Sequence, residues 1–192
     1  DYIGLKKNAS WLTRIETNGI KSMFKRLPGE AQEQFKYAVY NGNRKTASAI
    51  MRQHFGDEGV LALDDTYKLQ SEIYDDMRRL GYDIPKLDNY WHREVVDPKV
   101  ISKVQKNQFS KALSKQKQKL GRELTPGEVQ KLHERYIMHK GRYATTSGAL
   151  KERVIQHIGP EELAGYDDPI SGLEKMFMDH SEDISRREFF RS

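Results

Sequence analysis

A short aromatic stretch held between two prolines is the feature that most constrains this chain. Residues 90–93 read Tyr-Trp-His-Arg, and they lie between Pro85 and Pro98. Each proline removes a backbone N–H donor and disfavours the α conformation in the residue before it. We therefore expect residues 82–97 to be extended, with the aromatic pair filling a space between helices. The candidate core residues are Tyr90, Trp91, Arg93, Phe177 and Phe189.

Apolar residues recur at helical spacing through most of the remaining chain. The sequence is 36% hydrophobic and 32% charged, a polar balance that favours an elongated body with much exposed surface. We predict an all-α fold of about seven to eight helices. The expected helices cover residues 8–27, 29–41, 44–55, 64–80, 98–120, 125–140, 150–158 and 167–190, with one further helical turn at 160–163.

Local signals place the ends of several of these helices. Asp97-Pro98 and Thr125-Pro126 are typical helix starts, and Gly121 is a typical stop. Asp64 or Asp65 is the expected cap of the 64–80 helix, and residues 56–59 are predicted to form a loop. We divide the chain into a small helical bundle over 1–63 and a helical body over 64–192. The first residue is not Met, so we also expect a piece of a longer protein.

Positive charge is concentrated in one predicted helix. The whole chain carries a net charge of +5, yet the segment from Pro98 to Arg122 contains eight basic residues and no Asp or Glu. The apolar positions of this helix drift around its axis, so we expect its second half to project from the body. The candidate nucleic-acid-binding residues are Lys99, Lys103, Lys106, Lys111, Lys115, Lys117, Lys119 and Arg122.

Three interpretations of the basic helix stay open. Its lysines are point charges suited to phosphate, and Phe109 could stack on a base. A solvated or protein-contacting face would look the same, because lysines often cover apolar surface with their aliphatic stems. The third partner is an anionic membrane surface. Sequence-specific reading of DNA is disfavoured, because the segment has one arginine.

Catalytic and metal-binding patterns are scarce in the sequence. The chain has no cysteine, and no run of about 18 apolar residues that would span a membrane. His133-Glu134 begins like a zinc-protease motif, but position 137 is Ile instead of the second His. We predict no metal and no cofactor. His92 and Arg93, near Asp88 and Glu94, form the one cluster that favours acid–base catalysis.

Two stretches resemble helical segments of the large, multi-domain polyvalent proteins of bacteriophages and related mobile elements. They are residues 90–97 and residues 150–190, the second with a Tyr-Asp-Asp-Pro turn at 166–169 and an Arg-Arg-Glu-Phe-Phe ending. The chain departs from the family pattern at His92, where Pro is expected, and at Arg191, where Gly is expected. The resemblance implies a fragment of a protein carried in the virion or delivered with the genome.

Taken together, these observations favour a non-enzymatic structural or interaction module of a phage virion protein, serving assembly or genome delivery. Its expected partners are other virion proteins or other segments of its own parent chain. Its expected location is the virion interior or the host cytoplasm after delivery. The alternatives are a non-specific nucleic-acid-binding domain that uses residues 98–122, and an enzyme centred on His92 and Arg93.

Overall fold

The computed structural model describes residues 2–81, 89, 91–137 and 158–191. Within these residues the chain forms seven α-helices and one 3₁₀ helix, and it contains no strand. The predicted all-α class is confirmed. The helices are α1 (Tyr2–Thr17), α2 (Ile20–Arg26), α3 (Gly29–Tyr40), α4 (Arg44–Arg79), α5 (Pro98–Leu120), α6 (Pro126–Ile137), η1 (Pro160–Gly165) and α7 (Pro169–Arg191).

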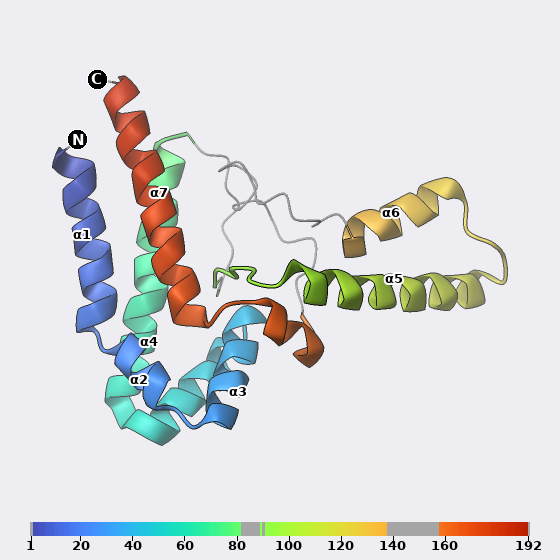
Figure 1. Cartoon of the computed structure of the whole chain (residues 1–192), viewed down its shortest axis with the longest axis horizontal. Coiled ribbons are helices and arrows are strands. Elements are labelled where there is room, and N and C mark those ends of the chain that lie inside the picture. The colour runs from blue at the N-terminus through green and yellow to red at the C-terminus, as the bar shows by residue number, and fades with distance from the viewer. Residues whose placement is uncertain (1, 82–88, 90, 138–157, 192) are drawn as a thin grey trace.

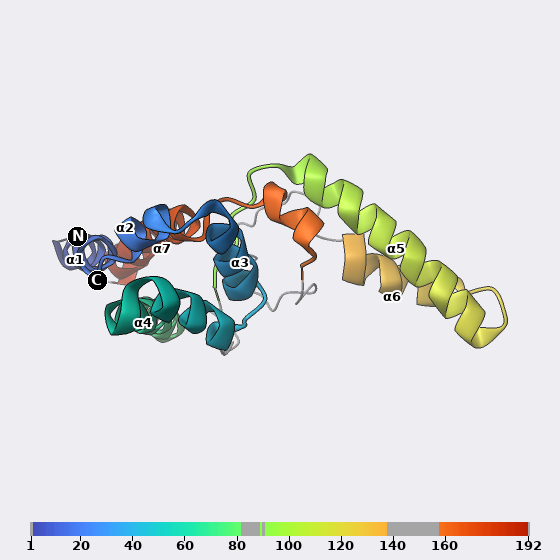
Figure 2. The ribbon, with the colours of Figure 1, turned by 90° about the horizontal axis from the view of Figure 1, so that it is seen from below.

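Two parts make up the molecule, a layered helical body and a two-helix arm. In Figure 1, α1 and α7 run side by side, and the second half of α4 runs along them. Figure 2 shows α1, α2 and α7 in one layer and α4 in another. The chain division proposed near residue 63 falls inside α4. Side chains from both sides of that division share one core, which includes Ile15, Phe35, Leu69 and Phe177.

The predicted helix over residues 8–27 is in fact two helices. α1 ends at Thr17 and α2 begins at Ile20, with Gly19 between them at a left-handed φ of 79°. The side-chain oxygen of Asn18 accepts a hydrogen bond of 3.0 Å from the backbone N–H of Ile20. An asparagine side chain that accepts from the backbone N–H two residues ahead competes with helix continuation, which explains the break.

The predicted interruption after residue 55 is present at Gly56, but the helix resumes at once, so the predicted loop over the rest of 56–59 and the predicted cap at Asp64 or Asp65 are wrong. α4 continues across this region with a single kink at Gly56, where φ is 63° and ψ is −147°. Gly59 fits the kink because a Cβ there would lie 2.6 Å from the carbonyl oxygen of Met51. Asp65 is instead a tertiary partner, because its carboxylate accepts a hydrogen bond of 2.7 Å from Arg14.

The ends of α5 and α6 follow the local signals. Asp97 Oδ1 accepts hydrogen bonds from the backbone N–H groups of Lys99 and Val100, at 2.9 and 3.4 Å. Gly121 ends α5 with a left-handed φ of 63°. Before α6, Thr125 and Glu128 exchange side-chain and backbone hydrogen bonds in a reciprocal cap.

The arm consists of α5 and α6, which pack against each other as an antiparallel pair. It projects from the body in both views, and only the base of α5 lies beside η1 (Figures 1 and 2). Ile101 and Gln105, both near this base, are the buried residues of α5. The expected projection of the second half of the basic helix is confirmed.

Candidate nucleic-acid interface

The base of the arm is held by a clasp between residues 91–97 and residues 165–169. Val95 pairs with Tyr166 in an isolated antiparallel bridge. The backbone N–H groups of Val96 and Asp97 donate to the carbonyl of Gly165, at 2.9 and 3.1 Å, and the N–H of Asp167 donates to the carbonyl of Glu94 at 2.9 Å. These bonds connect the start of α5 to the start of α7. Residues 82–88 and Tyr90 of the predicted extended segment lie outside the described residues, as do residues 138–157.

Trp91 fills the interior side of this clasp. Its side chain has no exposed surface. The ring meets Tyr67 and Phe35 edge-on, with centroid distances of 5.2 and 6.0 Å. Phe177 is also buried in this core. The side chain of Phe189 lies outside the described residues.

Arg93 ties the clasp to the end of α3. Its Nε donates a hydrogen bond of 3.0 Å to the carbonyl oxygen of Tyr40, and its Nη2 donates to the same oxygen. Tyr40 is the last residue of α3, so a cation lies at the negative end of that helix. The Tyr40 hydroxyl donates in turn to the carbonyl of Asp167 at 2.6 Å. Arg93 is therefore a structural cation in this fold.

Lysine and histidine side chains make further contacts beside the clasp. Lys36 Nζ donates to the carbonyls of Leu163 and Tyr166, at 2.7 and 2.5 Å, and burial lowers the pKa of its ammonium. Glu94 contacts His92 at 3.3 Å and forms an ion pair with Lys175.

The contacts with His92 and Lys175 both hold the pKa of the Glu94 carboxyl below its usual value. In the part of the chain that the structure describes, no group of three His, Cys, Asp or Glu side chains is placed to hold a metal ion.

All eight predicted phosphate-binding residues are exposed on the arm. A helix turns by about 100° per residue, which sorts six of them into two stripes on α5. Lys99, Lys103 and Lys106 span roughly 60° of the helix surface near the base of the arm. Lys111, Lys115 and Lys119 form the other stripe, roughly 150° away around the helix and towards the tip.

Two cations near the turn of the arm, Lys117 and Arg122, are paired with carboxylates. Lys117 forms an ion pair of 2.6 Å with Glu123, and Arg122 forms one of 2.9 Å with Glu128. The contact with Arg122 is the largest reason why the pKa of Glu128 falls to about 2. No ion pair joins the six striped lysines to a carboxylate among the residues described. The sequence reasoning did not identify these two glutamates as ion-pair partners, because Glu123 lies just beyond residue 122 and Glu128 lies on the next helix.

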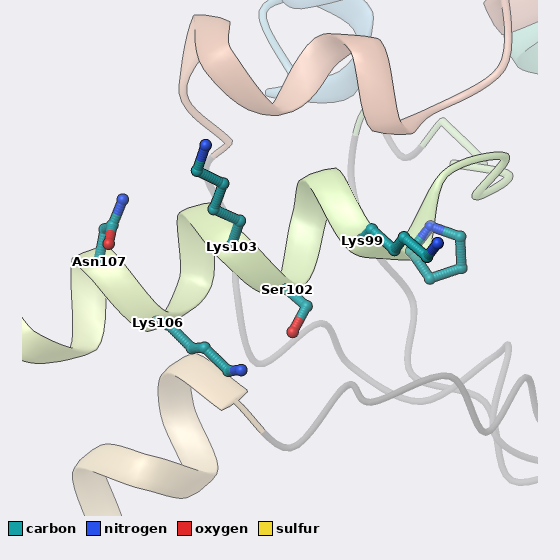
Figure 3. A pocket seen from close by; sticks show the side chains of 6 residues that line it. Lys99, Ser102, Lys103, Lys106 and Asn107 are labelled. Atoms are coloured by element: carbon teal, nitrogen blue, oxygen red, sulfur yellow. The ribbon is translucent and has the colours of Figure 1, made fainter.

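A hollow lies along the first three turns of α5. It has a volume of about 430 Å³ and is lined by Pro98, Lys99, Ser102, Lys103, Lys106 and Asn107. Figure 3 shows Lys103 extending towards the side of η1 and Lys106 towards the side of α6. Three of the predicted cations therefore line one shallow surface of α5 that is open to solvent, with Lys103 and Lys106 extending to its two sides.

Phe109 does not present a free ring for base stacking. Its ring meets that of His133 edge-on, with a centroid distance of 5.6 Å, so it packs between α5 and α6. This corrects the expectation that Phe109 stacks on a base. Among the described residues, the interface that remains is a set of ammonium groups.

No protein-family model, no curated protein and no solved structure matches this chain. Among the described helices, none is long and apolar enough to cross a bilayer.

Proposed function

We propose that this protein is a non-enzymatic helical module whose α5–α6 arm binds nucleic acid through its phosphates, without reading base sequence. The observation that carries the proposal is the exposure of all eight basic residues of Pro98–Arg122 on an element that projects from the body. From residue 98 to 133 the arm holds nine Lys and Arg against two Glu, a net charge of +7. Phosphate contacts of this kind supply most of non-specific binding.

The lack of sequence reading follows from the residue types. Lysine acts as a point charge, whereas base recognition in the major groove relies on bidentate side chains such as arginine. Arg122 is the one arginine of the segment, and Glu128 holds it. The arm is therefore suited to backbone contacts alone.

The test is a fluorescence titration of two labelled DNA duplexes of equal length and unrelated sequence. We expect equal affinities and about four phosphate contacts, which give a slope of roughly −3 to −4 for log affinity against log salt concentration. A flat salt dependence, a clear preference for one duplex, or no binding at 50 mM salt would overturn the proposal.

A second candidate is an assembly or genome-delivery module of a larger phage virion protein. The clasp favours it, because the two stretches that resemble polyvalent phage proteins are in direct contact there, through Val95 and Tyr166. The partners would be other virion proteins or other segments of the same parent chain. Sequencing the genomic region around the coding sequence tests this. Neighbouring phage structural genes are expected, and a region without any phage gene would contradict it.

A further inference from the structure

The hollow at the base of the arm is distinct from the rest of the basic surface. Lys99, Lys103 and Lys106 line it within a rise of about 10 Å along α5. All three are exposed, and none has an ion pair among the described residues. Lys117 returns to the same side of the helix, but it is paired with Glu123.

Neutral hydrogen-bond donors complete the lining of this hollow. The hydroxyl of Ser102 and the amide of Asn107 lie between or beside the three ammonium groups (Figure 3). A phosphate group offers charged oxygens that accept from both kinds of donor, and lysine is a common phosphate ligand. The hollow has a volume of about 430 Å³ and is open to solvent, so a phosphodiester unit of a longer strand can lie against it without being enclosed.

We propose that this hollow is the principal phosphate seat of the arm, and that it holds the phosphodiester backbone of a nucleic acid between Lys99, Lys103 and Lys106. The inference rests on the proposed function, and it adds where on the arm the binding energy is concentrated. The tip stripe of Lys111, Lys115 and Lys119 then contributes long-range attraction only.

The seat lies on the side of the helix and not at its end. The positive end of the α5 dipole favours an anion near residue 98. Asp97 Oδ1, however, already accepts from the N–H groups of Lys99 and Val100. Those donors are occupied, and the Asp97 carboxylate repels an approaching phosphate. The anion is therefore held by side chains of the first three turns.

Two matched triple variants test the location of the seat. Lys99→Gln/Lys103→Gln/Lys106→Gln and Lys111→Gln/Lys115→Gln/Lys119→Gln remove the same charge from exposed positions of the same helix. We expect the base triple to weaken duplex binding by at least about tenfold and to flatten the salt slope by about 2 to 3. The tip triple should weaken binding by less than about threefold. Equal losses in the two triples, or a larger loss in the tip triple, overturn the seat while leaving arm binding intact.

The failure of the seat can be told apart from the failure of the proposed function. If wild-type protein binds no duplex at low salt, nucleic-acid binding itself is refuted. Inorganic triphosphate added as a competitor distinguishes the two sources of phosphate. Displacement of the duplex only at millimolar triphosphate supports a polymer backbone as ligand. Tight triphosphate binding without duplex binding would identify a site for free phosphates and overturn the inference.

A gain-of-function variant provides an independent check. Asp97→Asn keeps a good helix cap and removes the carboxylate that caps α5. We expect duplex binding about twofold tighter, as for the loss of one like charge several ångströms from the ligand. Unchanged or weaker binding in a variant that retains its thermal stability would contradict a seat in this position.

Discussion

The indole Nε1 of Trp91 donates a hydrogen bond of 2.9 Å to the backbone carbonyl of Pro169, 78 residues further along the chain. Pro169 is the first residue of α7, and Trp91 lies seven positions before Pro98, the first residue of α5. The bond therefore fixes the arm-bearing segment to the long helix that packs on α1. The side chain of Trp91 thus links the base of the arm to the core of the body.

Trp91→Ala should destabilise the protein by about 3–5 kcal/mol, the range for truncation of a large buried aromatic. Trp91→Phe keeps most of the ring but leaves the Pro169 carbonyl without this donor, so it should cost about 1–3 kcal/mol. Chemical denaturation followed by circular dichroism measures both. Leu61→Ala is the control, because Leu61 is 67% exposed and should shift stability by less than about 0.5 kcal/mol. Equal midpoints for wild type and Trp91→Ala would refute the role of the clasp.

Arg93→Lys tests the contact with the end of α3. Arginine donates from Nε and Nη2 to the Tyr40 carbonyl, a two-point contact that a lysine ammonium does not reproduce. We expect Arg93→Lys and Arg93→Gln to lose similar stability, about 1.5–3 kcal/mol, in thermal or urea unfolding. If Arg93→Lys kept the full stability of the wild type, the positive charge alone would account for the contribution of Arg93, and the two-point contact would be refuted.

Gly165→Ala should loosen the attachment of the arm. A Cβ at Gly165 would lie 2.5 Å from Ile101 Cγ1, inside the contact between η1 and α5. Overpacking of this kind costs about 1–3 kcal/mol. Gly127→Ala is the matched control, because a Cβ there meets nothing within 4 Å and a helical alanine is favourable.

Hydrogen exchange of α5 reads out the effect of both glycine variants. We expect the backbone amides near Ile101 to exchange faster in Gly165→Ala than in the wild type. Their exchange rates should be unchanged in Gly127→Ala. The same protection in the two variants would contradict a tightly packed base.

The buried His180 should make the protein sensitive to mild acid. It is 4% exposed, and neither ring nitrogen has a hydrogen-bond partner in the described structure. Burial, aided by the nearby His92, lowers its pKa to about 4 from an ordinary 6.5. Between these two pKa values, His180 therefore binds a proton in the unfolded chain but not in the folded chain. Stability should fall by roughly 2–3 kcal/mol as pH drops from 6.5 towards 4.

His180→Leu should flatten this dependence, most clearly between pH 6.5 and 5. In that window carboxyls such as Glu94, whose pKa is lowered, still contribute their full stability. His54 is exposed, so His54→Gln should keep the wild-type slope. The measurement is urea unfolding at several pH values. An identical slope in His180→Leu and wild type would exclude His180 as the source.

The sequence predicted those features that depend on neighbouring residues. Asp97 caps α5 and Gly121 ends it, because capping chemistry acts over two or three positions. Prediction from the sequence failed where a tertiary contact determines the local structure. Gly59 sits in a helix because its missing Cβ lets the backbone approach Met51, and Asp65 is engaged by Arg14 instead of capping a helix.

The candidate interface was predicted in composition but not in arrangement. Counting charges identified all eight cations of residues 98–122. Counting did not separate the three that share a hollow from Lys117 and Arg122, which are neutralised across the turn of the arm. That separation depends on the antiparallel pairing of α5 and α6, which brings Glu128 beside Arg122. The partner of Arg93, a backbone carbonyl 53 residues earlier, carries no sequence signal of its own.

Chemical labelling of lysines with and without DNA tests the central claim most directly. An amine-reactive reagent is applied to the protein at low salt, alone and with a saturating duplex, and each lysine is quantified by mass spectrometry. The account predicts strong protection of Lys99, Lys103 and Lys106. Lys25, Lys45 and Lys68, which are equally exposed on the body, should react as before. Protection of the body lysines with unchanged reactivity along the arm would contradict it.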